Sequence, residues 1–343
     1  MHCHDSIMRY YRGVQPLFVI TERILESVSR VERVLGRYEG MHHPRPSPAL
    51  RRSSRVKTIQ GSLAIEGNTL TEEQITAILE GKRVVGPKAE ILEVQNAAAA
   101  YDKLAQWNPF VLNDLLQAHH VLMNGLVKGA GQWRSGAVGV MKGSQVTHIA
   151  PPADRVPYLM KDLVAALRQD SKLHPLVLGS IFHYELEFIH PFEDGNGRIG
   201  RLWHTLILTR YHGLFAHVPV ESIIKGRQSE YYSALEQCDQ AGASTVFIEF
   251  AMDAIREALE ETVALVAGKP VTAERRMELA AEHFQDRTFA RQDYMKLFPS
   301  LSTATASRDL KSACEQGLAR KQGDKAKAQY RFLLSTRSGS RES

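Results

Sequence analysis

The sequence has little cysteine and no long apolar run, and each of these absences narrows the class of protein. The three cysteines, Cys3, Cys238 and Cys314, lie far apart in a chain of 343 residues. This spacing excludes a disulfide-rich scaffold and a paired-cysteine metal site, and it fits a reducing compartment. No apolar stretch reaches membrane-spanning length, and the short apolar patch near the N-terminus is interrupted by Pro16. We therefore expect a cytoplasmic protein with neither a signal peptide nor a membrane anchor.

Neither sign of charge is in large excess, but the charge is unevenly distributed. The formal net charge is +5. Residues 1–60 carry 11 Lys and Arg against 5 Asp and Glu, residues 61–270 carry 18 against 24, and residues 271–343 carry 14 against 9. Basic ends of this kind can contact nucleic acid, and they can equally be solvated charge on helix faces. Charge alone leaves both alternatives open.

Apolar residues recur at helical spacing through most of the chain, which predicts a mainly α fold. The expected helices are 17–39, 49–65, 71–81, 88–106, 109–126, 154–170, 175–188, 198–212, 227–240 and 245–267. Thr71 and Gln74 form the pattern of a capping box at the start of the third of these. Two short β-prone runs, 138–140 and 146–149, predict a small hairpin ended by a pair of prolines.

A Gly-Lys-Pro linker at 268–272 precedes a segment with a different pattern. Helices expected at 273–284, 291–297 and 300–317 are followed by two strands at 318–322 and 328–333, which is the outline of a winged helix-turn-helix. The basic residues Lys321, Lys325 and Lys327 in the expected wing suit contacts with phosphate. DNA binding is one alternative for this domain, and dimerisation or protein docking is the other. Residues 335–343 are rich in Ser, Arg and Gly and are expected to be a disordered tail.

The segment 190–201, HPFEDGNGRIGR, carries the clearest chemistry in the chain. The backbone amides of Gly195, Asn196 and Gly197 can form an anion nest, and the helix that follows offers its N-terminal N–H groups to the same anion. Arg198 and Arg201 are three residues apart, so both project from one face of the first turn. Two arginines beside such a nest suit a polyphosphate better than a carboxylate. The simpler alternative for a lone Asp-Gly-Asn-Gly is a polar turn that caps a helix.

An acid and a histidine flank this turn. Asp194 is a hard oxygen ligand beside the expected phosphate site, where it would hold a nucleotide-bound Mg²⁺. His190, at the end of an apolar helix, is suited to accept a proton from an incoming hydroxyl at neutral pH. His119, His120 and His183 are interpreted as structural residues.

Segment 190–201 resembles the Fic family signature, His-Pro-Phe-x-Asp/Glu-Gly-Asn-Gly-Arg-x-x-Arg, at every fixed position, and the resemblance extends over roughly residues 50–265. Fic proteins are mainly helical, and most transfer AMP from ATP to a protein hydroxyl. The resemblance implies that His190 is the general base and that Asp194 holds Mg²⁺. It also implies that residues 195–197 and Arg198 bind the phosphates, while Arg201 reaches the γ-phosphate. Doc-type kinases of the family have a lysine where this chain has Gly197, which argues against phosphorylation.

Two further segments resemble parts of the Fic family. Thr147, His148 and Ile149 would lie in a flap hairpin that aligns the target segment by strand addition. Tyr231 or Tyr232 would lie near the adenine, and ordinary helix packing explains these tyrosines equally well.

Ser62, Glu66 and Gly67, in the stretch SLAIEGN, resemble the inhibitory motif of the family, Ser/Thr-x-x-x-Glu-Gly/Asn. Glu66 would pair bidentately with Arg201 and occupy the charge and space meant for the γ-phosphate, so that ATP would bind only in an unproductive pose. The same carboxylate could orient a water for the reverse reaction, removal of AMP from a modified protein. The alternative for a Ser and a Glu near a helix end is a solvated turn.

Together these features predict a mainly α protein with a Fic-type helical core, a small β-hairpin flap and a C-terminal winged helix-turn-helix. Residues 1–85 would form an N-terminal region with the inhibitory helix, 86–267 the catalytic core, 272–334 the winged-helix domain and 335–343 the tail. The expected function is self-inhibited transfer of AMP, from ATP with Mg²⁺, to a Ser, Thr or Tyr hydroxyl of a target protein and of the enzyme itself. The alternative is a DNA-binding regulator whose Fic core senses nucleotide. The open partners are the target protein, DNA and a second copy in a homodimer, and no membrane partner is expected.

Overall fold

The computed structural model describes residues 18–40, 46–142, 145–169, 173–267, 272–298, 301–323 and 328–333. The chain divides into two compact units, Met1–Val263 and Ala264–Ser343. Each unit has a hydrophobic core of its own. The expected division near residue 85 stays a prediction, and the expected tail at 335–343 lies outside the described residues.

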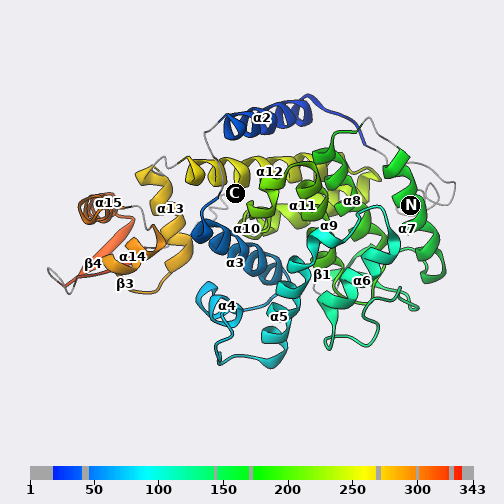
Figure 1. Ribbon diagram of the computed structural model, residues 1–343, viewed down its shortest axis with the longest axis horizontal. Helices are drawn as coiled ribbons and strands as arrows, with labels where there is room; N and C mark the ends of the chain where they lie inside the picture. The colour runs from blue at the N-terminus through cyan, green and yellow to red at the C-terminus, as the bar shows by residue number, and fades with distance from the viewer. Residues whose placement is uncertain are drawn as a thin grey trace, which may run out of the picture. The chain divides into compact units, whose positions relative to one another are not determined.

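The first unit consists of α-helices and one small hairpin (Figure 1). Its helices are α2 (Glu22–Glu39), α3 (Pro48–Ile65), α4 (Glu72–Leu79), α5 (Lys88–Asp102), α6 (Leu112–Met123), α7 (Val156–Gln169), α8 (Pro175–Ile189), α9 (Asn196–Tyr211), α10 (Val220–Gly226), α11 (Gln228–Ala241) and α12 (Thr245–Val266). Short 3-10 helices lie at η1 (Leu104–Gln106), η2 (Ala153–Arg155) and η3 (Gly213–His217), and the hairpin is β1 (Gly139–Lys142) with β2 (Gln145–Ile149). The prediction of a mainly helical fold is confirmed. Among the described residues, none of the helices combines the length and apolar character needed to span a bilayer.

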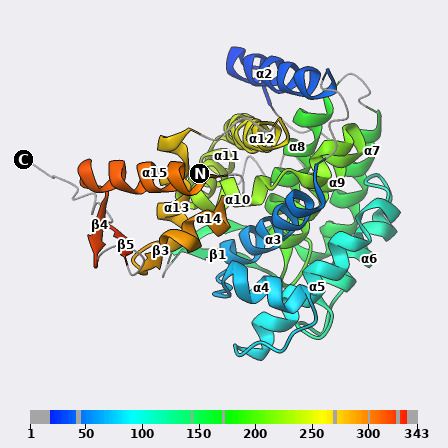
Figure 2. The same cartoon turned by 60° about the vertical axis from the view of Figure 1, so that its left-hand side comes forward.

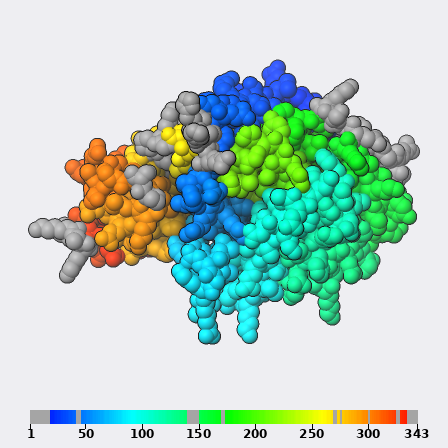
Figure 3. Space-filling model, in the orientation of Figure 1, coloured from blue at the N-terminus to red at the C-terminus, as the bar shows by residue number. Residues whose placement is uncertain are grey.

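Two apolar helices, α8 and α9, lie side by side at the centre of this unit (Figures 1 and 2). Glycine on each helix allows their close approach. A Cβ added at Gly179 would lie 2.8 Å from the ring of His204, and one at Gly200 would lie 3.0 Å from the ring of His183. Both rings are buried, and the indole of Trp203 is fully buried beside them. Around this pair, α5 and α6 form a continuous surface on the face drawn in Figure 3.

α3 packs against α10 at a second close approach. A Cβ added at Gly61 would lie 2.7 Å from the carbonyl carbon of Glu221 and 2.8 Å from Ser222 N. Ser47 caps the start of α3 with its hydroxyl, and Gly67, at a φ of 94°, lets the chain turn away after Glu66. The last residues of α3 are therefore fixed in position by α10.

α4 begins with the capping box that the sequence predicts. The Thr71 hydroxyl accepts a hydrogen bond from Gln74 N at 3.3 Å, and Gln74 Oε1 accepts one from Thr71 N at 2.9 Å. Side-chain patterning does not predict η3 or α10, because each is too short to show a helical period.

The second unit consists of α13 (Ala273–Phe284), β3 (Phe289–Ala290), α14 (Arg291–Leu297), α15 (Thr303–Glu315), β4 (Ala319–Gln322) and β5 (Gln329–Phe332). The predicted helices and both predicted strands are present. The additional strand β3 completes an antiparallel sheet of order β3-β5-β4. A buried ion pair holds two helices of the unit together: Arg276 Nε donates to Asp309 Oδ2 at 2.7 Å, and the Tyr294 hydroxyl donates to the same oxygen at 3.1 Å.

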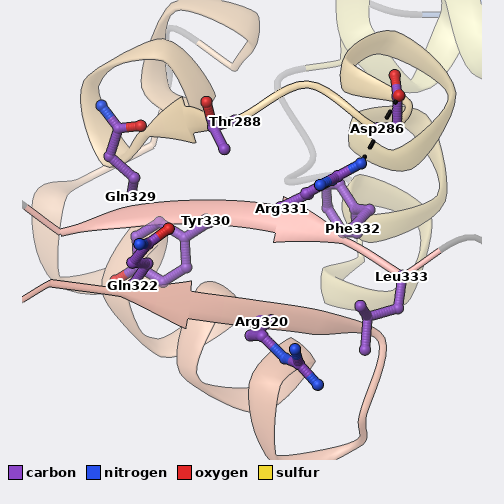
Figure 4. A pocket seen from close by; sticks show the side chains of 9 residues that line it. All are labelled: Asp286, Thr288, Arg320, Gln322, Gln329, Tyr330, Arg331, Phe332 and Leu333. Atoms are coloured by element: carbon purple, nitrogen blue, oxygen red, sulfur yellow. Dashed lines mark ion pairs between the residues drawn. The ribbon is translucent and has the colours of Figure 1, made fainter.

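One face of this sheet is hollowed, and the hollow is lined by both polar and apolar side chains (Figure 4). Arg320 lies directly across from Arg331, and Gln322 from Gln329, so these four side chains project from the same face. They line a hollow of about 440 Å³ together with Asp286, which lies 3.7 Å from the guanidinium of Arg331. Figure 4 shows the guanidinium of Arg331 turned towards Asp286 and that of Arg320 pointing the other way.

Gly61→Ala is expected to lower the free energy of unfolding of the first unit by about 1–3 kcal/mol, because the added Cβ would overlap backbone atoms of α10. Gly36→Ala in α2 is the matched control. Nothing lies within 4 Å of a Cβ at that position, so the change is expected to be neutral or to stabilise by up to about 1 kcal/mol. All three tryptophans lie in the first unit, so urea unfolding followed by tryptophan fluorescence measures both variants. Equal effects would contradict the close approach of α3 to α10.

Candidate active site

The segment between α8 and α9 forms a closed loop. Asn196 ties it together, because its side chain accepts a hydrogen bond from Phe192 N and donates one to Phe192 O, both at 2.9 Å. Gly195 has a φ of 83°, and a Cβ there would lie 2.6 Å from the sulfur of Met123. Only glycine fits that position. Phe192 itself is fully buried.

His190 ends α8 in the left-handed conformation, with φ 49° and ψ 59°. Its ring atom Nδ1 lies 3.4 Å from the carbonyl oxygen of Glu187. A carbonyl oxygen only accepts hydrogen bonds, so a hydrogen bond at this contact requires the proton to be on Nδ1. In the neutral ring the lone pair is then on Nε2, which is the state required of a proton acceptor.

Asp194 and Arg198 are paired beside the first turn of α9. Arg198 Nη2 donates to Asp194 Oδ1 at 2.9 Å, and Arg198 Nη1 donates to Glu93 Oε1 of α5 at 2.8 Å. Arg198 is buried, whereas the Asp194 side chain is 55% exposed. The Asp194 carboxylate is therefore accessible to a ligand from solvent while its arginine partner is held in place.

Arg201 connects α9 to α3. Its Nη2 donates to Glu66 Oε1 at 2.7 Å and to the carbonyl oxygen of Ser62 at 2.9 Å, and its Nε donates to the Ser62 hydroxyl at 3.2 Å. Burial by itself lowers the pKa of this guanidinium, but the adjacent Glu66 carboxylate raises it, and the net pKa lies above its ordinary value. Arg201 is a buried, permanently charged group that is matched by one acid, and a single hydrogen bond joins the two side chains instead of the predicted bidentate pair.

Glu66 lies against the first turn of α9. A Cβ at Gly197 would collide with Glu66 Oε1 and would lie 2.9 Å from Arg201 Nη1. The carboxylate thus occupies the surface of the helix N-terminus that the sequence assigns to phosphate. Gly67, with its positive φ, follows directly and ends α3 at this point.

Tyr231 and Tyr232 differ in their surroundings. Tyr231 is fully buried, and its hydroxyl donates to Glu187 Oε1 at 3.0 Å and lies 3.2 Å from His183 Nε2. This geometry favours core packing for Tyr231. Tyr232 is 43% exposed, and its hydroxyl donates to the carbonyl oxygen of Ile65, the last residue of α3.

The hairpin β1–β2 has the expected position in the chain. Its pairs include Gly139 with Ile149 and Val140 with His148, and the register shifts after Val140. Thr147, His148 and Ile149 lie in β2, and their side chains lie outside the part of the chain that the structure describes.

Residues 109–208 match the sequence profile of the Fic/DOC family. A solved structure of a Fic family protein from Desulfovibrio desulfuricans G20 is 42% identical to this chain, with a TM-score of 0.71. That alignment covers 94% of this chain and 99% of the other. The chain belongs to the Fic/DOC family.

Other Fic proteins are similar over a smaller share of their length. "Protein adenylyltransferase fic-1" of Caenorhabditis elegans is 32% identical over 252 residues, which are 68% of this chain and 48% of that protein. "Protein adenylyltransferase Fic" of Drosophila melanogaster is 31% identical over 269 residues, covering 75% and 51%. A solved fragment of C. elegans Fic-1 is 25% identical, with a TM-score of 0.59, and covers 72% of this chain and 74% of the fragment. The chain spans about half the length of the curated relatives it matches.

His119 contacts the loop between α8 and α9, in keeping with the structural role expected from the sequence. Its ring stacks on Phe192 with 3.6 Å between centroids. Its Nδ1 accepts from Gly131 N and its Nε2 donates to the carbonyl oxygen of Asp194, both at 2.9 Å. The contact joins residues 75 positions apart, so no local pattern reveals it.

Acid is expected to destabilise the first unit through its buried histidines. Burial lowers the pKa of His119 from 6.5 to about 4, and it lowers the pKa of His204 to about 4 as well. Because these rings stay neutral in the folded state, the unfolded chain binds the extra protons as the pH falls below 6.5. The free energy of unfolding is expected to be greatest above pH 6.5 and to fall between pH 6.5 and 4, by roughly 3 kcal/mol per histidine.

Urea titrations of the wild type and of His204→Phe at pH 7 and pH 4.5 measure this loss. The variant is expected to lose less stability between the two pH values than the wild type, whatever its stability at pH 7. An equal loss in both proteins would show that His204 does not bind a proton on unfolding.

Proposed function

We propose that this Fic protein transfers AMP from ATP to a Ser, Thr or Tyr hydroxyl of a target protein and of itself, and that Glu66 holds it in an inactive state. The observation that carries the proposal is the ion pair between Glu66 and Arg201, at the N-terminus of α9. The adenylyltransferase names of the C. elegans and D. melanogaster relatives support the reaction.

Phosphate binding is supported by unused donors at this helix end. The first-turn amides of α9 have no acceptor within the helix, which favours an anion at residues 195–197. Arg201 Nη1 and Arg198 Nε are buried atoms with no hydrogen-bond partner among the described residues. Phosphate oxygens are acceptors that would satisfy both guanidinium groups.

The acidic residues fit a magnesium ion that arrives with its nucleotide. Among the described side chains, no group of three or more His, Cys, Asp or Glu is arranged to hold a metal. One accessible carboxylate, that of Asp194, is what Mg²⁺ uses when phosphates and water complete its coordination. The bound ion would neutralise charge on the phosphates.

His190 supplies the proton acceptor. In the proposed reaction its Nε2 removes the proton of the target hydroxyl, and the hydroxyl oxygen bonds to the α-phosphorus of ATP. The bond from that phosphorus to the bridging oxygen breaks, and pyrophosphate leaves. The product is an AMP ester of the target. Thr147, His148 and Ile149 align the target as an added strand on the hairpin, and Tyr231 or Tyr232 lies on the adenine side.

Glu66 inhibits by competing for Arg201. Its carboxylate already pairs with Nη2 of the guanidinium and lies over Gly197, so a γ-phosphate would meet both occupied space and like charge. ATP is then displaced from the in-line pose that transfer requires. In the proposed function the same carboxylate would also orient a water for the removal of AMP from a modified target.

Glu66→Gly is expected to raise AMP transfer by about 10-fold or more, because it removes a charged competitor for Arg201. His190→Ala in the same background is expected to lower transfer by about 10²–10⁴-fold. Labelled ATP incubated with each variant, alone and with lysate proteins, measures both effects. Glu80→Gly is the matched control, because Glu80 is also a C-cap glutamate in an ion pair, with Lys82. Unchanged transfer in Glu66→Gly would refute the inhibitory role.

DNA binding by the second unit is a further candidate function. Its order of helices and strands supports the winged-helix assignment. Arg320 and Arg331 are directly opposite residues of two strands, and Arg331 lies 3.7 Å from Asp286. A DNA phosphate would be a further anionic partner for these two cations, and the amides of Gln322 and Gln329 offer donors beside them.

Replacing Arg320 and Arg331 with alanine is expected to weaken binding to duplex DNA and to reduce the slope of log K against log salt by about 1 per lost phosphate contact. Gel shifts on genomic fragments at several salt concentrations measure both. Lys296→Ala is the control, because Lys296 is an exposed cation of the same unit that does not line the hollow. Identical binding by wild type and double variant would exclude this face as the DNA contact.

A further inference from the structure

A buried arginine outside the signature segment, Arg134, donates to a cluster of backbone carbonyls. Arg134 is 6% exposed. Its Nε donates to the carbonyl oxygen of His190 at 2.7 Å, its Nη1 to that of Gly136 at 2.8 Å, and its Nη2 to those of Ile189, at 3.4 Å, and Pro151. Its own backbone N–H donates to the carbonyl oxygen of Pro191 at 3.0 Å. Burial lowers the pKa of this guanidinium, an effect that a carboxylate partner would oppose.

One part of this cluster is the end of α8. The carbonyls of Ile189, His190 and Pro191 follow one another, and carbonyls at a helix C-terminus have no partner within the helix. His190 also adopts the left-handed conformation, which costs roughly 1–2 kcal/mol for a residue other than glycine. Arg134 donates hydrogen bonds to these carbonyls while His190 has a φ of 49°. These hydrogen bonds therefore stabilise the left-handed conformation of His190.

The other part of the cluster is the base of the hairpin. Gly136 precedes β1 and Pro151 follows β2. Between these two residues and the strands, Ala150 N donates a hydrogen bond to the carbonyl oxygen of Val138 at 3.2 Å, which joins the two arms of the hairpin. One guanidinium therefore holds both arms of the hairpin and the backbone of His190.

We propose that Arg134 is a positioning residue that places His190 and the hairpin in one fixed relation, so that the hydroxyl of a target aligned on the hairpin reaches the ring of His190. This inference rests on the proposed function. Arg134 acts through backbone carbonyls and does not itself touch the nucleotide, whose phosphate contacts lie at 194–201.

The hydrogen bonds made by the side chain at position 134 require the guanidinium group of arginine. A guanidinium presents five N–H donors in a rigid plane, which lets Nε, Nη1 and Nη2 reach carbonyls from separate segments at once. A lysine ammonium keeps the charge but has three donors on one atom. Arg134→Lys therefore removes the simultaneous hydrogen bonds to separate segments but keeps the positive charge.

The test uses the whole 343-residue chain carrying Glu66→Gly, in which transfer is expected to be measurable. Arg134→Lys and Arg134→Ala are each expected to lower kcat for AMP transfer by about 10–100-fold, because small misplacements of reacting groups have effects of that size. The KM for ATP is expected to change by less than about threefold, because the nucleotide contacts are elsewhere. Free guanidinium at millimolar concentration is expected to restore a measurable part of the rate to Arg134→Ala and none to Arg134→Lys.

Arg210→Ala is the matched control. Arg210 also donates to backbone carbonyls, those of Ala105 at 3.0 Å and Trp107 at 2.8 Å, and it contacts neither the hairpin nor the loop at His190. Its loss is expected to leave kcat within about twofold. Full activity of Arg134→Lys, equal losses in the Arg134 and Arg210 variants, or no rescue of a folded Arg134→Ala by guanidinium would each overturn the inference.

Hydrogen–deuterium exchange keeps the inference testable apart from activity. In Arg134→Lys, amides at 136–142 and at 190–195 are both expected to exchange faster than in the parent chain, while those of α3 do not change. If Glu66→Gly transfers no AMP, the proposed function fails, and this exchange pattern alone then decides whether Arg134 links the two segments. If Arg134→Ala does not fold, Arg134→Lys carries both measurements.

Discussion

The ion pair between Arg201 and Glu66 is the interaction on which the rest of the site depends. A fully buried guanidinium cannot lose its charge and is costly without an anionic partner. The fold offers that partner from α3, whose last turn is fixed against α10 at Gly61. In the proposed function a nucleotide phosphate is the alternative partner. A site with Glu66 withdrawn and no phosphate bound would leave the charge uncompensated, so the pairing with Glu66 that stabilises the resting protein would, in the proposed function, also oppose nucleotide binding.

Two kinds of side chain build this site, and they differ in charge. Asn196 and neutral His119 hold the loop through its backbone, and they would do so whether or not a ligand is bound. Arg198 and Arg201, by contrast, make ion pairs that a polyphosphate would compete for. The loop therefore keeps its shape while its charged contacts are exchanged, which is the preorganisation that electrostatic catalysis requires.

The sequence predicts the parts of this structure that depend on local pattern. Long helices with a strong period, the capping box at Thr71 and the hairpin are found within a few residues of their expected bounds. The sequence also predicts the pairing of Glu66 with Arg201, because the chain contains both the inhibitory motif at 62–67 and the Fic signature at 190–201. The sequence does not predict contacts between residues that are far apart in the chain. Arg134 and His190, which form a hydrogen bond, are 56 positions apart, and Arg198 and Glu93 are 105 positions apart. Elements as short as β3 carry no periodic signal.

Glu66 is the C-cap of α3, and in the proposed function this position would set the time scale on which inhibition responds. Loss of one terminal helical turn is a sub-microsecond to microsecond event, far faster than typical enzyme turnover. Two side chains of α11, Gln228 and Tyr232, donate to the carbonyl oxygen of Ile65 and oppose that loss. Inhibition by Glu66 would then behave as a rapid pre-equilibrium: it scales the competent fraction of molecules at every instant and introduces no lag before activity begins.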